Sequence, residues 1–179
     1  MNTKMWSWIA LPFALFLTGC PDGGGGEGGF GSGAQVAYVA NSGSNDVSAY
    51  TISPTTGVLL AVAGSPFAAG TTPNAVTVSP NGQFLYVANG GGNVSAYTIA
   101  SGTGVLTAVA GSPFAAGTTP NGITIDPNGQ FLYVANGGGN VSAYTITVGT
   151  GALVSLGAGL GNPFSAGNTP TGIVTTGRP

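Results

Sequence analysis

The stretch Pro80–Ile99, PNGQFLYVANGGGNVSAYTI, decides the fold of this 179-residue chain. Ser79-Pro80-Asn81-Gly82 predicts a tight turn, because Pro fixes φ and Asn-Gly accepts positive φ. Runs rich in β-branched and aromatic residues follow at Gln83–Ala88 and Val94–Ile99, separated by the glycine-rich Asn89–Asn93. The pattern predicts two antiparallel strands joined by a short loop.

This stretch belongs to a unit of about 47 residues that occurs three times. Two further short strands are predicted beside it, at Ala75–Ser79 and Val105–Val109. A repeat of this length, with four short strands in each copy, is typical of a β-propeller blade. The tetrapeptide YVAN stands at Tyr38–Asn41, Tyr86–Asn89 and Tyr133–Asn136, and VSAY stands at Val47–Tyr50, Val94–Tyr97 and Val141–Tyr144.

Both faces of the predicted central strand are apolar. Phe84, Tyr86 and Ala88 share one face, and Leu85 and Val87 share the other, because side chains alternate along a strand. An isolated sheet would show one polar face, whereas a blade packed between two neighbours would not. We therefore expect the tyrosines and phenylalanines of the repeat to pack between blades.

The repeats have a permuted start. The first unit begins at Gln35 with the second strand of a blade, and Thr171–Thr175 matches the first strand of the other units. The expected fold is all-β, a partial β-propeller of about three four-stranded antiparallel blades in residues 34–179, with repeats at about 35–79, 80–126 and 127–179. Closed propellers have four to eight blades. Three alternatives stay open: a truncated propeller, an open arc, or a six-bladed ring of two chains that exchange the terminal strand.

The N-terminus has the pattern of a targeting segment. Residues 1–19, with Lys4 before an apolar stretch, are predicted to be a signal peptide that forms a helix. Leu17-Thr18-Gly19-Cys20 resembles the bacterial lipobox, which implies cleavage between Gly19 and Cys20 and lipidation of Cys20, the only cysteine. Residues 20–33, the lipidated Cys20 and the glycine-rich segment after it, are expected to act as a flexible tether. These features predict a membrane-anchored lipoprotein of the bacterial envelope, periplasmic or surface-facing.

Charged residues are scarce in the repeats. From Ala34 to Pro179 the only ones are Asp46, Asp126 and Arg178, and the chain has no His. Without a basic surface, nucleic acid is not expected as a partner. No catalytic residue, metal site or cofactor is predicted. Asp46 and Asp126 occupy turn positions where other repeats have Asn or Ser, so we expect each carboxylate to bond its own backbone.

The repeat motifs resemble the lactonase family of seven-bladed β-propellers, which includes bacterial 6-phosphogluconolactonase-like and YVTN-repeat proteins. The resemblance runs from Gln35 to about Thr175 and rests on YVAN, on GSNDVSAYTI and on VSPNGQFLYVAN. It implies a propeller fold and, for enzymatic members, hydrolysis of a sugar lactone. The chain departs from the family in having about three blades, and no catalytic residue can be carried over by position.

The sequence therefore favours a lipid-anchored binding or scaffold module with a neutral surface of Asn, Ser, Thr and Gly. Its expected partners are the membrane, through the lipid on Cys20, and a second copy, another envelope protein or a glycan. A lactonase-family hydrolase and a truncated, inactive remnant of one are the alternatives.

Overall fold

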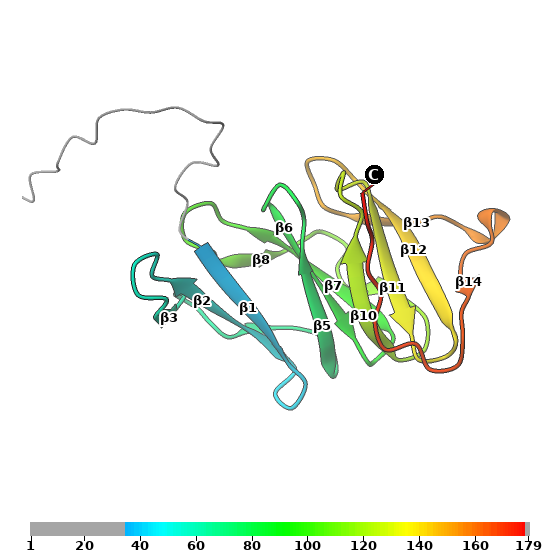
Figure 1. Cartoon of the computed structure of the whole chain (residues 1–179), viewed down its shortest axis with the longest axis horizontal. Helices are drawn as coiled ribbons and strands as arrows, with labels where there is room; N and C mark the ends of the chain where they lie inside the picture. The colour runs from blue at the N-terminus through cyan, green and yellow to red at the C-terminus, as the bar shows by residue number, and fades with distance from the viewer. Residues whose placement is uncertain (1–34, 178–179) are drawn as a thin grey trace, which may run out of the picture. The chain divides into compact units, whose positions relative to one another are not determined.

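Three antiparallel sheets, one for each copy of the repeat, make up residues 35–177, which are the part of the chain that the computed structural model describes (Figure 1). The predicted partial propeller is thus confirmed, with almost no helix. The predicted signal peptide, Gly19, Cys20 and the tether lie outside the described residues.

The two complete sheets repeat one topology. Four strands run in sequence order across each sheet, and a fifth strand of two residues pairs with the third one. The second sheet contains β5 (Pro73–Val78), β6 (Phe84–Asn89), β7 (Asn93–Ile99), β8 (Leu106–Ala108) and β9 (Phe114–Ala115). The third contains β10 (Pro120–Ile125), β11 (Phe131–Asn136), β12 (Asn140–Ile146), β13 (Leu153–Ser155) and β14 (Phe164–Ser165), with the short 3₁₀ helix η1 (Ala158–Leu160) before β14.

The first sheet begins one strand later, as the permuted start predicts. Its order is β1-β2-β3, with β4 paired to β2, so β1 forms its edge. These strands are β1 (Gln35–Asn41), β2 (Asp46–Ile52), β3 (Leu59–Ala61) and β4 (Phe67–Ala68). In the other sheets the strands equivalent to β1 are β6 and β11, and each of them pairs with a preceding strand as well.

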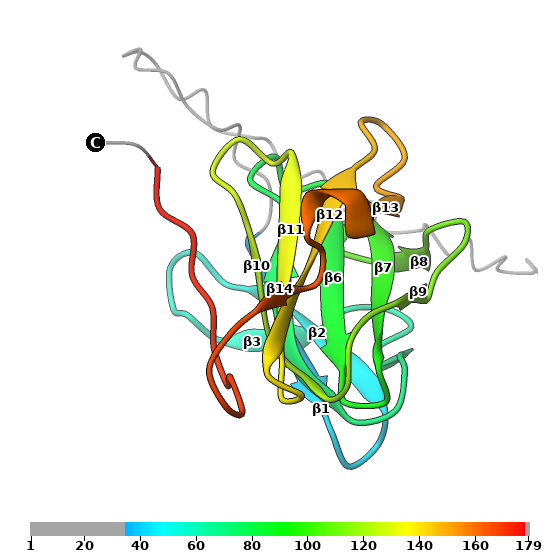
Figure 2. The same ribbon diagram turned by 90° about the vertical axis from the view of Figure 1, so that its right-hand side faces the viewer.

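The predicted strand at Thr171–Thr175 does not form. Residues 171–177 have no strand assignment, because within the described chain they find no partner for a hydrogen-bonded ladder. They nevertheless lie beside β10, as Figure 2 shows in red. The Thr175 hydroxyl donates to the Ile125 carbonyl at 2.6 Å, and the Asn121 side chain donates to the Pro170 carbonyl at 3.2 Å.

The bond from Asn121 to the Pro170 carbonyl has an equivalent between β5 and β10. There the Asn74 side chain donates to the Pro120 carbonyl at 2.9 Å. Asn74 and Pro120 occupy the same repeat positions as Asn121 and Pro170. The C-terminal segment therefore occupies the place of a first strand in a further blade.

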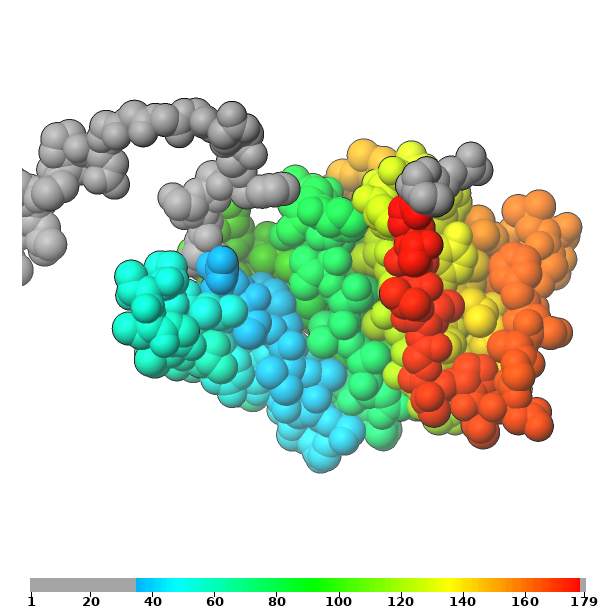
Figure 3. All heavy atoms as spheres, viewed as in Figure 1, coloured from blue at the N-terminus to red at the C-terminus, as the bar shows by residue number. Residues whose placement is uncertain are grey.

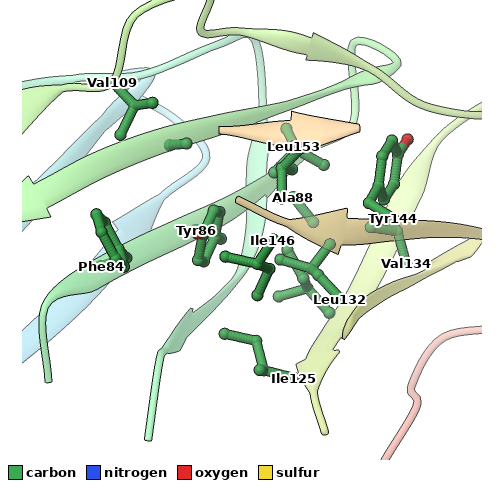
Figure 4. Packing of buried hydrophobic residues seen from close by; sticks show 13 residues of the cluster. Phe84, Tyr86, Ala88, Val109, Ile125, Leu132, Val134, Tyr144, Ile146 and Leu153 are labelled. Carbon is green, nitrogen blue, oxygen red and sulfur yellow. The ribbon is translucent and has the colours of Figure 1, made fainter. Parts of the chain in front are cut away.

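The core lies between the sheets. All six residues of β6 are buried, so both of its faces are covered, as the sequence pattern predicts. Phe84, Tyr86 and Ala88 belong to a cluster with the third sheet, in which Leu132 and Ile146 take part (Figure 4). On the other face, Leu85 and Val87 pack in a cluster with Val47, Tyr38 and Phe67 of the first sheet. Apolar burial on both faces is therefore what joins the blades.

Candidate functional site

Tyrosine hydroxyls cross from one blade to the next at fixed repeat positions. Tyr38 donates to the Gly104 carbonyl at 2.8 Å, and Tyr86 donates to the Gly151 carbonyl at 2.9 Å. Two other tyrosines reach back to the preceding blade. The Tyr144 hydroxyl donates to the Ala115 carbonyl at 2.6 Å, and the Tyr97 hydroxyl donates to the Ala68 carbonyl. Burial raises the pKa of each of these phenols above the ordinary value of 10.0. The prediction that these tyrosines pack between blades is confirmed, and they are structural.

A buried amide closes the end of each central hairpin. Asn89 is fully buried, and its Nδ2 donates to Asn93 Oδ1 at 2.8 Å and to Ser95 Oγ at 2.9 Å. Asn136 makes the same two bonds in the third sheet, to Asn140 and Ser142. The prediction from sequence did not include this arrangement, although its signal was present: the Asn of YVAN is followed four or five residues later by Asn or Asp, and two residues after that by Ser.

In the first sheet, Asp46 accepts the hydrogen bond that Asn93 and Asn140 accept in the other two sheets. Its Oδ1 accepts from Asn41 Nδ2 at 2.7 Å. The expectation that this carboxylate bonds its own backbone is wrong. The exchange between Asp and Asn is tolerated because the position needs only a side-chain oxygen, which both residues supply.

Asp126 does cap its own turn, as predicted. Its Oδ1 accepts from the backbone N–H groups of Gln130 and Phe131, both at 2.7 Å, and its Oδ2 accepts from the N–H of Asn128 at 3.3 Å. Ser79 holds the corresponding place in the second sheet, where its Oγ accepts from the N–H of Phe84 at 2.9 Å. Both carboxylates of the described chain are thus used in local structure.

The two capped turns line a cleft between the second and third sheets. The cleft has a volume of about 450 Å³. Asn81 and Gln83 contribute amides from one turn, and Asn128 and Gln130 contribute amides from the equivalent turn of the next blade. The first pair is held in place by hydrogen bonds, since Asn81 Oδ1 accepts from Ser79 Oγ at 2.6 Å and Asn81 Nδ2 donates to Gln83 Oε1 at 3.2 Å.

Apolar side chains form the rest of the cleft, with Phe84, Ile146 and Val148 among them. Side-chain amides beside an apolar surface can both donate and accept hydrogen bonds while shielding the ligand from water. No charged side chain lines this cleft. Its chemistry suits a neutral, hydroxyl-rich or amide-rich ligand.

A second, more open hollow lies at the other end of β6. It has a volume of about 380 Å³ and is formed by Gly90–Gly92 together with residues 116–119. The N–H groups of Gly90 and Gly91 are used by the carbonyls of Thr72 and Thr71. This hollow offers fewer side-chain groups than the cleft does, so the cleft is the better candidate site.

Clusters of metal-ligating side chains and membrane-spanning helices are both absent from residues 35–177. Within that range no three His, Cys, Asp or Glu side chains gather as metal ligands. No helix of the described part has the length and hydropathy needed to span a membrane. Cys20 and Gly19, the residues of the predicted lipidation and cleavage site, lie outside this range.

The blades described above place this protein in the class of β-propellers. A family model described as "Lactonase, 7-bladed beta-propeller" matches residues 23–165. The chain therefore belongs to the lactonase family of seven-bladed β-propellers, as the repeat motifs predicted. No curated protein sequence matches the chain.

Solved structures support the fold. A Bacteroides fragilis protein whose proposed activity is that of a 6-phosphogluconolactonase is 24% identical with a TM-score of 0.67, and the match covers 76% of this chain and 37% of that one. The periplasmic gluconolactonase PpgL of Pseudomonas aeruginosa is 20% identical with a TM-score of 0.60, covering 68% and 36%. A protein of unknown function from Desulfotomaculum acetoxidans is 22% identical with a TM-score of 0.61, covering 69% and 41%.

The chain thus spans well under half the length of these relatives. Identities of this size support a shared fold, and the fold does not imply the activity.

Proposed function

We propose that this protein is a lipid-anchored module of the bacterial envelope that binds a neutral polar ligand through the cleft between its second and third blades. The observation that carries the proposal is the pairing of two amide-bearing turns, Asn81-Gly82-Gln83 and Asn128-Gly129-Gln130, across one apolar cleft. Neutral envelope polysaccharides have the chemistry that such a cleft recognises, because their hydroxyls match amides and their ring faces match apolar side chains.

Binding to purified neutral polysaccharides and to peptidoglycan tests this proposal. Gln130→Ala removes one amide of the cleft, and we expect it to weaken binding about tenfold, which corresponds to one or two hydrogen bonds. Gln35→Ala is the matched control, since Gln35 holds the same repeat position at the start of β1 but does not line the cleft. Equal affinities for both variants and the wild-type chain would contradict the role of the cleft.

The lipid anchor has its own test. The lipobox-like Leu17-Thr18-Gly19-Cys20 supports attachment of acyl chains to Cys20. Each buried methylene contributes about 0.8 kcal/mol, so several chains on one residue anchor a protein firmly. We expect the wild-type chain to take up labelled fatty acid and to fractionate with membranes, and Cys20→Ala to lose both properties. An unlabelled wild-type chain would rule out the anchor.

Hydrolysis of a sugar lactone is the second candidate function, and family membership favours it. Lactone hydrolysis needs a base to activate water and a donor or cation to stabilise the oxyanion. Asp46 and Asp126 are the carboxylates of the described residues, and both accept structural hydrogen bonds. We expect no turnover of gluconolactone above the buffer rate. Turnover that disappears on heating and in Asp126→Asn would favour the enzyme instead.

A further inference from the structure

Within residues 35–177 of one copy, the contacts that join neighbouring blades are used only partly. Each blade has a forward face, which packs on the next blade, and a rear face, which packs on the preceding one. Blades 1, 2 and 3 are the first, second and third sheets. Within residues 35–177, no blade follows the forward face of blade 3, and no blade precedes the rear face of blade 1.

The rear face of blade 1 is exposed where its equivalents are buried. Leu59 is 51% exposed, whereas Leu106 and Leu153, at the same repeat position, are each 6% exposed. Val39 is 45% exposed, whereas its equivalents Val87 and Val134 are fully buried. An apolar surface of this kind, with the same residue types that form a core one blade further on, marks an interface.

The forward face of blade 3 has the complementary groups. Phe84 of blade 2 lies over Gly151 of the next blade, so closely that a Cβ on Gly151 would collide with the ring. Phe131 is the equivalent of Phe84, and Gly57 is the equivalent of Gly151. No heavy atom of residues 35–177 lies within 4 Å of the Gly57 Cβ position, and Phe131 is partly exposed. Within the described part of one copy, the ring and the glycine that would receive it are therefore both open to a further contact.

The strand edges complement each other in the same way. β1 is a sheet edge that lacks the preceding strand which β6 and β11 have. The C-terminal segment 171–177 lies beside β10 in the place of such a strand, at the surface of the third sheet (Figure 3), and it has no ladder partner. Val174 in this segment is 81% exposed.

We propose that two copies of this chain pair reciprocally: the C-terminal segment of each copy adds to the β1 edge of the other, and blade 3 of each packs on blade 1 of the other. The pairing of β5 with β6 fixes the register. Ala75↔Ala88, Val76↔Val87 and Thr77↔Tyr86 become Gly172↔Ala40, Ile173↔Val39 and Val174↔Tyr38 between the copies. Tyr133 donates to the Gly57 carbonyl of the second copy, as Tyr86 donates to Gly151.

A reciprocal pair covers both faces that residues 35–177 leave open in each copy, whereas the β1 edge that these residues leave unpaired in a lone copy would invite aggregation. The near-absence of charge fits this arrangement, because nothing charged in residues 35–177 other than Asp46 and Asp126 opposes close approach. This inference is independent of the proposed ligand, since the cleft lies between blades 2 and 3 of one chain.

Disulfide trapping in the full-length chain tests the pairing and its register. Directly opposite residues of antiparallel strands lie within the range that a disulfide spans. We expect Val39→Cys/Ile173→Cys to give a covalent dimer on a non-reducing gel, with no ladder of larger species. The register-shifted pair Val39→Cys/Val174→Cys places its side chains on opposite faces and should give none. The two single variants control for crosslinks through Cys20.

A charge in the interface provides the second test. Leu59→Asp buries a carboxylate against blade 3 of the second copy, which should lower the trapped dimer on the order of tenfold or more. Leu60→Asp is the matched control. Val154 holds the equivalent position in blade 3 and stays 56% exposed although blade 2 packs against that blade, so the residue at this position lies outside the interface between blades. The detergent-corrected native mass of the wild-type chain completes the set. A monomeric mass, a crosslinked ladder, or equal trapping by both cysteine pairs would overturn the reciprocal dimer.

Discussion

At the scale of single residues, Asn89 shows how a buried amide organises a hairpin. Its Nδ2 donates two hydrogen bonds, while its Oδ1 is buried and has no hydrogen-bond partner among residues 35–177. Asn89→Ala removes both bonds and should lower the free energy of unfolding by about 1–3 kcal/mol. Asn89→Asp keeps the shape but sets an acceptor against Asn93 Oδ1, so we expect a larger loss. Urea denaturation of both variants measures the order, and an aspartate variant as stable as the alanine variant would contradict it.

Tyr86 links a single buried hydroxyl to the pH dependence of stability. Burial raises its pKa above 10.0, so the folded chain holds the phenolic proton more tightly than the unfolded chain does. Stability is therefore fully present below pH 10 and falls as the pH rises through 10 and beyond. Tyr86→Phe has no proton to release and should show a shallower alkaline loss, although it is less stable at pH 7. Equal slopes for the two proteins above pH 10 would count against this account.

At the scale of elements, the turn before β11 depends on one carboxylate. Asp126 accepts from three backbone N–H groups, and Ser79 makes a simpler cap in the equivalent turn. Asp126→Ala leaves these donors without their acceptor and should cost about 1.5–3 kcal/mol, the range for hydrogen bonds to a charged group. Asp126→Ser should recover part of the loss, because the serine hydroxyl can reproduce the bond of Ser79. Thermal unfolding compares both variants with the wild-type chain, and a melting temperature of Asp126→Ala equal to that of the wild type would show that the cap contributes nothing.

At the scale of the whole molecule, repetition made the fold predictable. Alternating apolar faces in FLYVAN implied blades packed on both sides, and β6 is buried accordingly. The strand predicted at Thr171–Thr175 did not form, because a strand needs a partner that local sequence does not report. The bond of Asp46 to Asn41 was missed for a similar reason: it joins the two ends of a hairpin loop rather than a residue and its own backbone. The cleft depends on two turns that stand 47 residues apart in the chain, and only the packing of the blades brings them together.

The close packing of neighbouring blades predicts at which glycines a side chain would destabilise the molecule. Gly151 has φ +71 and lies under the Phe84 ring, whereas Gly102 has φ +78 and no atom of the described chain within 4 Å of its Cβ position. Alanine at either position incurs the strain of a left-handed backbone, about 1–2 kcal/mol. Gly151→Ala also forces blades 2 and 3 apart, which should add about 1–3 kcal/mol. The difference between the two variants in guanidinium unfolding isolates the contact between blades. Equal stabilities would mean that the blades adjust freely to one another, and tight interlocking could not then be what makes the repeats fold as a unit.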